Sequence, residues 1–185
     1  MHSDPSGHAA PVRRISVIQG EHAVSTDAGA VMSTVLGSCV AACVYDEARG
    51  VGGMNHFLLS ESATGARIEE EAMRYGAYAM EVLINDLMKL GASRAGLKCK
   101  LFGGAKMFDS LNDVGAANAA FARRFMSDEG IEVVGASLGG RSARRIEFWP
   151  ASGRVRQREV EQAPEAVVAP KRAPPPPATG GVELF

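Results

Sequence analysis

The stretch Val31-Met-Ser-Thr-Val-Leu-Gly-Ser-Cys39-Val40 predicts an extended segment, a Gly-Ser turn and the start of a second extended segment. It places a cysteine directly after the turn, and the later stretch Gly52-Gly-Met-Asn-His56-Phe57 places a histidine close behind a glycine pair. A thiol needs a nearby base to become a nucleophile at neutral pH, and imidazole is the usual base. Glycines beside both groups would leave room for a substrate to approach the backbone. Cys39 and His56 are therefore the first candidates for a catalytic thiol–imidazole pair.

The composition indicates one core-forming domain and excludes several classes of protein. The chain has 185 residues, of which 46% are hydrophobic, so it can bury a sizeable core. The net charge of -1 argues against a general nucleic-acid binder, which would carry a basic excess. No apolar run is long enough to span a membrane, and the N-terminus lacks the basic-then-apolar plan of a signal peptide. We therefore expect no membrane insertion and a cytoplasmic location.

The cysteines are expected to be free thiols, because their number is odd and no export signal precedes them. Cys39 and Cys43 resemble half of a zinc site, but no second pair with ligand spacing follows, so no metal is expected. Cys43 and Cys99 lie inside predicted strands, where a cysteine is usually a buried structural thiol. The turn before Cys39 distinguishes it from the other two.

Hydrophobic periodicity predicts a single α+β domain over residues 12–160, between a flexible leader (1–11) and a disordered Pro-rich tail (161–185). The clearest helix covers 69–90 and ends at Gly91, and a second helix is expected at 114–129. Strands are expected at 13–19, 30–36, 40–45, 52–59, 97–102, 131–136, 144–148 and 154–159. The domain should therefore contain mixed or antiparallel sheets and two packed helices.

The imidazole of such a pair needs a third group to orient it. Two hydroxyls, Ser33 and Thr34, lie on the predicted strand before the cysteine. Asp46 and Asn55 carry side chains of types more familiar in this role. Asn55 adjoins His56, however, and should therefore point to the opposite face of the sheet. From the residues alone, the orienting group stays open.

Four motifs follow one another along the chain: Leu36-Gly-Ser-Cys39-Val-Ala-Ala-Cys43, Gly52-Gly-Met-Asn-His56-Phe57, Phe102-Gly-Gly-Ala-Lys-Met-Phe108 and Gly139-Gly-Arg-Ser-Ala-Arg144-Arg145. Each motif is weak alone, but the ordered set resembles the CheD family, the chemoreceptor glutamine deamidases of bacterial chemotaxis. The resemblance covers about residues 13–160. It implies an α+β fold of mixed sheets and packed helices, similar to certain toxin deamidase domains.

The resemblance also implies roles for individual residues. The catalytic cysteine and histidine of the family match Cys39 and His56. The family's third catalytic residue is typically a threonine, at the position that Ser33 fills here, and Thr34 follows directly. Backbone N–H groups from Gly37 and Ser38 to the cysteine are the expected donors to the oxyanion of the reaction.

Candidate docking residues lie on the last two motifs. Gly103, Gly104 and Phe108 are expected to form one wall of the site; the alternative for them is a tight turn followed by core residues. Arg141 and Arg144 are expected to contact acidic receptor helices; the alternative for each is a solvated basic face.

The implied activity is protein-glutamine deamidation, which needs no metal or organic cofactor because the thiolate supplies the nucleophile. The implied substrate is the helical cytoplasmic part of methyl-accepting chemotaxis receptors. The family also binds response-regulator phosphatases of the CheC type, so a non-enzymatic adaptor is the alternative function. A cysteine peptidase or a transglutaminase-like acyltransferase would share the chemistry. Intact Cys39 and His56 favour an enzyme.

Overall fold

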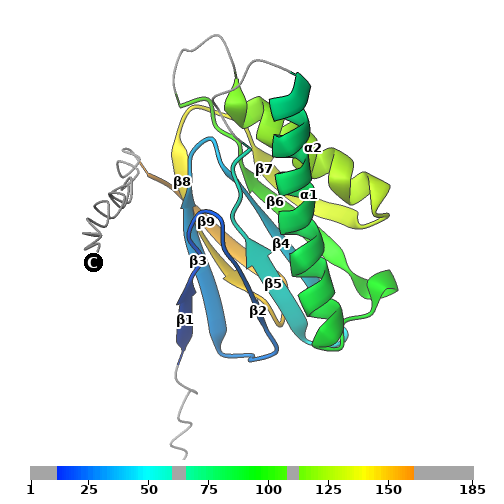
Figure 1. Ribbon diagram of the computed structural model, residues 1–185. Helices are drawn as coiled ribbons and strands as arrows, with labels where there is room; N and C mark the ends of the chain where they lie inside the picture. Colours follow the sequence, from blue (N-terminus) through cyan, green and yellow to red (C-terminus); the bar gives the residue numbers. More distant parts are fainter. Residues whose placement is uncertain (1–11, 60–65, 108–112, 161–185) are drawn as a thin grey trace, which may run out of the picture.

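The protein is built in three layers, two β-sheets and a pair of helices (Figure 1). The computed structural model describes residues 12–59, 66–107 and 113–160. The two sheets pack face to face, and the helices cover the outer face of the larger sheet. This arrangement confirms the α+β domain with mixed sheets and two main helices that the sequence predicts.

The smaller sheet has four strands, and all but one of its strand pairs are antiparallel. The parallel pair joins β1 to β3. In spatial order the strands are β1 (Arg13–Ser16), β3 (Ala30–Leu36), β8 (Ala143–Trp149) and β9 (Arg154–Val160).

The larger sheet has five strands and is also mixed, with β6 and β7 parallel and the other pairs antiparallel. In spatial order the strands are β2 (His22–Ser25), β5 (Val51–Asn55), β4 (Val40–Asp46), β6 (Lys98–Gly103) and β7 (Glu132–Leu138). Every residue of the central strand β4 is buried, because one of its faces meets the smaller sheet and the other meets the helices.

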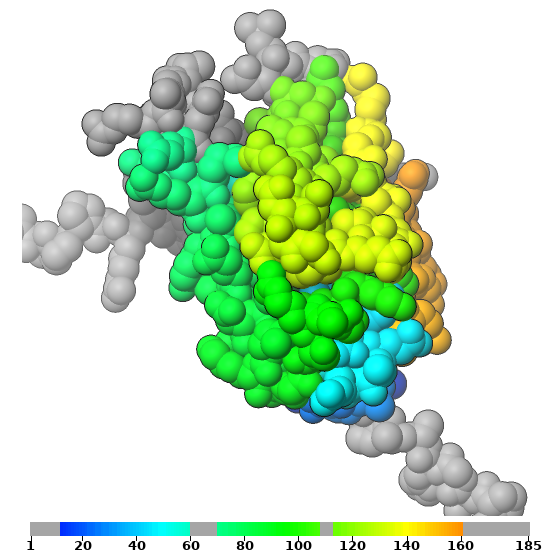
Figure 2. All heavy atoms as spheres, turned by 90° about the vertical axis from the view of Figure 1, so that its right-hand side faces the viewer, coloured from blue at the N-terminus to red at the C-terminus, as the bar shows by residue number. Residues whose placement is uncertain are grey.

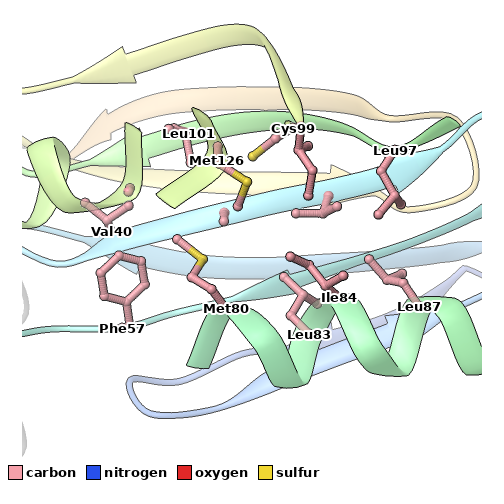
Figure 3. Packing of buried hydrophobic residues seen from close by; sticks show 14 of the residues in the cluster. Val40, Phe57, Met80, Leu83, Ile84, Leu87, Leu97, Cys99, Leu101 and Met126 are labelled. Atoms are coloured by element: carbon pink, nitrogen blue, oxygen red, sulfur yellow. The ribbon is translucent and has the colours of Figure 1, made fainter. Parts of the chain in front are cut away.

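The two helices bury apolar stripes against the larger sheet. Helix α1 (Ala66–Lys89) and helix α2 (Val114–Asp128) lie side by side over this face, as Figure 2 shows. Met80, Leu83 and Leu87 of α1 point toward the strands in Figure 3 and are fully buried. Burial of each such side chain stabilises the fold by about 1.5–3 kcal/mol.

The glycine pair of β5, Gly52 and Gly53, lets neighbouring backbone pack closely against the strand. A Cβ added at Gly52 would lie 2.3 Å from the carbonyl oxygen of Pro150, and one at Gly53 would lie 2.7 Å from that of Ala23. Both distances are too short for a side chain. The expectation that these glycines make room for a substrate is therefore wrong, because neighbouring backbone fills the space.

The structure departs from the predicted elements at several places. The predicted turn that includes His22 instead leads into β2, a short edge strand, and a 3₁₀ turn, η1 (Arg94–Gly96), was also not predicted. Strand β5 ends at Asn55, so His56 lies just beyond the strand. The predicted leader and Pro-rich tail lie outside the described residues. In the part of the chain that is described, no helix is both long and apolar enough to cross a membrane.

Candidate active site

Cys39 and His56 adjoin a single backbone bridge at the end of the larger sheet. Cys39 directly precedes β4, and His56 directly follows β5. The bridge pairs Val40 with Phe57 through two N–H···O bonds of 3.0 and 2.9 Å. In antiparallel pairing the residues before each partner share one face and are diagonal neighbours, typically about 7–8 Å apart at Cα. The bridge thus puts the thiol and the imidazole on one face, within reach of each other.

The imidazole faces the space between the two sheets. Asn55 points the other way, where its side-chain amide donates to the carbonyl oxygen of Ala79 on α1 at 3.1 Å. This confirms the expectation that Asn55 cannot orient the neighbouring histidine. Because successive side chains alternate, His56 shares its direction with Met54, which belongs to the core between the sheets.

Thr34 is the hydroxyl that meets the imidazole. Its Oγ1 lies 2.8 Å from Nδ1 of His56, and both residues are buried, with 6% of each exposed. Thr34 has the same strand parity as Met32 and Leu36, which face the core between the sheets. Ser33 has the opposite parity and is directed to the other face of β3. Of the two candidate hydroxyls, Thr34 and not Ser33 is therefore the one that contacts the imidazole.

Burial lowers the pKa of His56 below its ordinary value, because the charged imidazolium loses its hydration; the backbone of Val17 opposes this shift. The imidazole is therefore neutral at pH 7. Among the described residues, no group forms a hydrogen bond with its buried Nε2. Thr34 thus engages one ring nitrogen, and the other makes no hydrogen bond within the described part of the chain.

Cys39 is the most accessible of the three thiols. It is partly exposed, whereas Cys43 and Cys99 are fully buried, as the sequence predicts. Burial raises the pKa of the Cys43 and Cys99 thiols well above the ordinary value, so neither supplies a thiolate. The Sγ atom of Cys39 lies 3.3 Å from the side-chain Oε1 of Gln19, which comes from the turn between β1 and β2.

Hydrogen bonds to three consecutive carbonyl groups hold the loop that carries Cys39. The carbonyl oxygens of Gly37, Ser38 and Cys39 accept hydrogen bonds from the N–H of Ala105 (2.8 Å), Nδ2 of Asn118 (3.0 Å) and the N–H of Gly104 (2.8 Å). In a planar trans peptide the next N–H points opposite to the carbonyl. The N–H groups of Ser38 and Cys39 are therefore directed away from Ala105 and Asn118, respectively.

Gly103 and Gly104 lie against the backbone of this loop. Their φ angles are 108° and 66°, in the region that favours glycine. A Cβ at Gly103 would lie 2.1 Å from the carbonyl oxygen of Cys39. The pair therefore packs against the backbone of Cys39 and of α2, and its role as a wall of the site stays a prediction. Phe108 lies outside the described residues.

Asn118 is a site residue that the sequence reasoning missed. It is fully buried on α2, and besides its bond to Ser38 its Oδ1 accepts a hydrogen bond of 2.8 Å from the N–H of Leu59. One side chain thus ties the loop before Cys39 to the segment after His56. The available signal was a polar residue on the inner stripe of α2, beside Phe121 and Ala122.

The two arginines expected to dock a partner behave differently. The guanidinium of Arg144 donates to the carbonyl oxygens of Ser137 (2.7 Å) and Gly139, and only 6% of the residue is exposed. It therefore holds the loop between β7 and β8, a role that does not favour contact with a receptor. Arg141 lies exposed on the same loop, where docking stays a prediction.

Comparison with known proteins identifies the family. Residues 58–159 match the family model CheD, described as CheD chemotactic sensory transduction. The chain belongs to the CheD family. A "Probable chemoreceptor glutamine deamidase CheD" from Caulobacter vibrioides (strain NA1000 / CB15N) is 59% identical over 190 residues, which are 100% of this chain and 97% of the relative.

Other CheD relatives agree over nearly the whole chain. Proteins of the same description are 53% identical in Acidiphilium cryptum, over 98% of this chain and 99% of the relative, and 52% identical in Rhizobium meliloti, over 94% and 96%. Among solved structures, one of a Neisseria meningitidis protein aligns with a TM-score of 0.45 and 13% identity, over 70% of this chain and 63% of that one. At that distance it says nothing about function.

Proposed function

We propose that this protein deamidates glutamine side chains of chemoreceptors, converting them to glutamate with release of ammonia. The observation that carries the proposal is the setting of His56: Nδ1 contacts Thr34, and Nε2 has no hydrogen-bond partner among the described residues, on the face that His56 shares with Cys39. The relatives at 52–59% identity, each described as a probable chemoreceptor glutamine deamidase, support the choice of substrate.

The first step is attack of the thiol on the carboxamide. Nε2 of His56 accepts the proton of the Cys39 thiol, and the sulfur forms a bond to the carboxamide carbon of the substrate. The electron pair of the carbonyl bond moves to oxygen. Nδ1–H donates to the hydroxyl of Thr34, which keeps the lone pair on Nε2 and stabilises the imidazolium that forms.

The second step releases ammonia and then regenerates the thiol. The imidazolium returns its proton to the leaving nitrogen as the carbon–nitrogen bond breaks, which leaves a thioester on Cys39. His56 then takes a proton from water, whose oxygen attacks the thioester carbon. The sulfur leaves as thiolate and recovers the proton, and the substrate side chain departs as glutamate.

Backbone N–H groups are proposed to stabilise the oxyanion of both steps. The N–H groups of Ser38 and Cys39 are suited to this because the carbonyls of Gly37 and Ser38 are fixed on the opposite side by Ala105 and Asn118. These donors are already oriented before a substrate binds, so little reorganisation is needed.

The substrate segment is proposed to be the helical cytoplasmic part of methyl-accepting receptors, which places the enzyme in the cytoplasm. Arg141 is a candidate contact for acidic residues of such a helix. A response-regulator phosphatase of the CheC type is a further proposed partner, since the family binds such proteins.

Mass spectrometry of a receptor cytoplasmic domain tests the proposal. Incubation with the protein should add about one mass unit at specific glutamines, the difference between an amide NH₂ and OH in this mechanism. The Cys39→Ala variant should add none, and Cys43→Ala, at a buried thiol, should leave the reaction intact. Binding without any mass change would favour the adaptor function, and backbone cleavage or amine incorporation would indicate a peptidase or an acyltransferase.

A further inference from the structure

Gln19 is the only glutamine that contacts the nucleophile among the described residues. Its Oε1 lies 3.3 Å from Sγ of Cys39, and neither the catalytic pair nor the orienting hydroxyl accounts for it. The carbon of a substrate carboxamide must come to about 3–3.5 Å from the attacking sulfur. The carboxamide of Gln19 therefore borders the place where a substrate carboxamide must approach the sulfur, although its backbone belongs to a turn far away in the sequence.

The backbone holds this turn in place against the histidine. The N–H of Gly20 donates to the carbonyl oxygen of His56 at 2.8 Å, and the N–H of His56 donates to the carbonyl oxygen of Glu21 at 3.0 Å. The N–H of Glu21 also donates to the carbonyl oxygen of Ile18 at 3.0 Å. The main chain on both sides of Gln19 is thus fixed relative to the imidazole, so the side chain stays within reach of the sulfur.

We infer that Gln19 is a further catalytic residue, whose side-chain NH₂ donates a hydrogen bond to the oxyanion. This rests on the proposed deamidation. In the free enzyme Oε1 accepts a hydrogen bond from the thiol. When the thiol proton passes to His56 and the sulfur–carbon bond forms, the charge develops on the substrate oxygen, and a donor is then needed. Rotation of the terminal amide presents Nε2, because one carboxamide carries both an acceptor and two donors.

Removal of the side chain should not disturb the fold, because Gln19 is exposed in the free protein. A bound receptor helix would cover it and exclude water, which strengthens such a hydrogen bond during the reaction. The Gln19→Ala variant should therefore fold normally, with an effect on the rate rather than on stability.

The experiment measures kcat and KM for deamidation of a receptor domain by wild type, Gln19→Ala and Gln19→Glu. Loss of one oxyanion donor is expected to lower kcat about 100-fold in Gln19→Ala with little change in KM. Gln19→Glu keeps the shape but offers an anion and no donor, so its kcat should fall further. Gln157→Ala, at an exposed glutamine on β9, is the matched control and should behave as wild type.

The rate at which iodoacetamide alkylates Cys39 separates the possible outcomes. For an oxyanion donor, Gln19→Ala should be alkylated at a rate within about threefold of wild type while deamidation falls, because alkylation forms no oxyanion. Faster alkylation together with faster deamidation would overturn the inference, since Gln19 would then obstruct the thiol. Equal deamidation by wild type and Gln19→Ala would also overturn it but leave the proposed function standing. If wild type deamidates no receptor, the proposed function fails and the inference fails with it.

Discussion

The hydroxyl of Thr34 lies 2.8 Å from Nδ1 of His56, and this hydrogen bond crosses from the smaller sheet to the larger one. Thr34 lies on β3 and His56 directly follows β5, and these two strands belong to different sheets. The orientation of the imidazole therefore depends on the packing of the two sheets against each other. Each prediction below tests one of the contacts that build this site.

Loss of the Thr34 hydroxyl should impair catalysis. We expect Thr34→Val to lower kcat roughly 10- to 100-fold, because the imidazole loses the group that fixes its tautomer. Thr34→Ser should retain most of the activity, and Ser33→Ala, on the opposite face of β3, should retain all of it. The measured deamidation rates of the three variants test this prediction about Thr34. A loss in Ser33→Ala with none in Thr34→Val would assign the role to Ser33.

The acid side of the pH profile should reflect the buried imidazole. Because burial lowers the pKa of His56, kcat/KM should fall to half its maximum at a pH below the ordinary histidine value of about 6.5. An NMR titration of the His56 ring, with the unfolded chain as reference, would measure the pKa directly. A ring that titrates at or above the reference value would contradict the prediction.

The lowered pKa of His56 also makes the free energy of unfolding depend on pH. Between the lowered pKa of the folded state and the ordinary value of the unfolded state, the unfolded chain binds more protons, so stability rises with pH in that window. The contribution of His56 is present above about pH 6.5 and is lost as the pH falls through its folded pKa. Urea unfolding of wild type and His56→Gln should show a difference that shrinks on acidification.

Asn118 should matter for both folding and activity. Asn118→Ala leaves the carbonyl of Ser38 and the N–H of Leu59 without their buried partner, which should cost about 2–4 kcal/mol of unfolding free energy. Activity should fall as well, because the loop before Cys39 loses one of its anchors. Chemical denaturation measures the first effect. Asn85→Ala, at an exposed asparagine on α1, is the control and should change stability by less than about 0.5 kcal/mol.

Gly103 should not tolerate a side chain. Gly103→Ala would bring Cβ to 2.1 Å from the Cys39 carbonyl oxygen, so we expect a loss of more than about 3 kcal/mol or failure to fold. Gly91→Ala is the matched control: its φ of 98° is similar, but nothing lies within 4 Å of the added Cβ, and it should lose only about 1 kcal/mol. Equal effects of the two substitutions in thermal unfolding would show that the close approach is unimportant.

Arg141 and Arg144 should separate into a docking residue and a structural residue. Arg144→Met removes the guanidinium from the carbonyls of Ser137 and Gly139 and should destabilise the protein by about 3 kcal/mol, whereas Arg145→Met, at the exposed neighbour, should not. Arg141→Ala should keep stability and raise KM for the receptor domain. Unchanged KM in Arg141→Ala would remove it from the docking surface.

Most of the fold follows from hydrophobic periodicity. The helix α1 and the strands β3 and β4 lie within a few residues of their predicted bounds, because their apolar residues must face a core whatever the topology. Strand β2 escaped prediction because four residues starting with a histidine carry too little apolar alternation. Its pairing with β5 stabilises an extended conformation that its own sequence does not predict.

Some residues of the site could likewise be predicted from the sequence, and others could not. Cys39 and His56 could be chosen from the sequence because a thiol behind a turn and a histidine beside a glycine pair are unusual locally. The choice between Ser33 and Thr34 could not be made, because both faces of β3 are largely buried and its sequence shows no alternation that reveals which face meets His56. Gln19 and Asn118 reach the site through tertiary packing, which no local pattern reports.

The contact between Gly103 and Cys39 also bears on how such an enzyme can change its targets. The position of Cys39 is set largely by main-chain atoms, with carbonyls of the loop held by the N–H groups of Gly104 and Ala105. Main-chain atoms are the same in every amino acid, so side chains on the surrounding surface can be replaced without moving the sulfur. Selectivity for a new receptor can therefore evolve by surface substitutions while the chemistry is inherited unchanged.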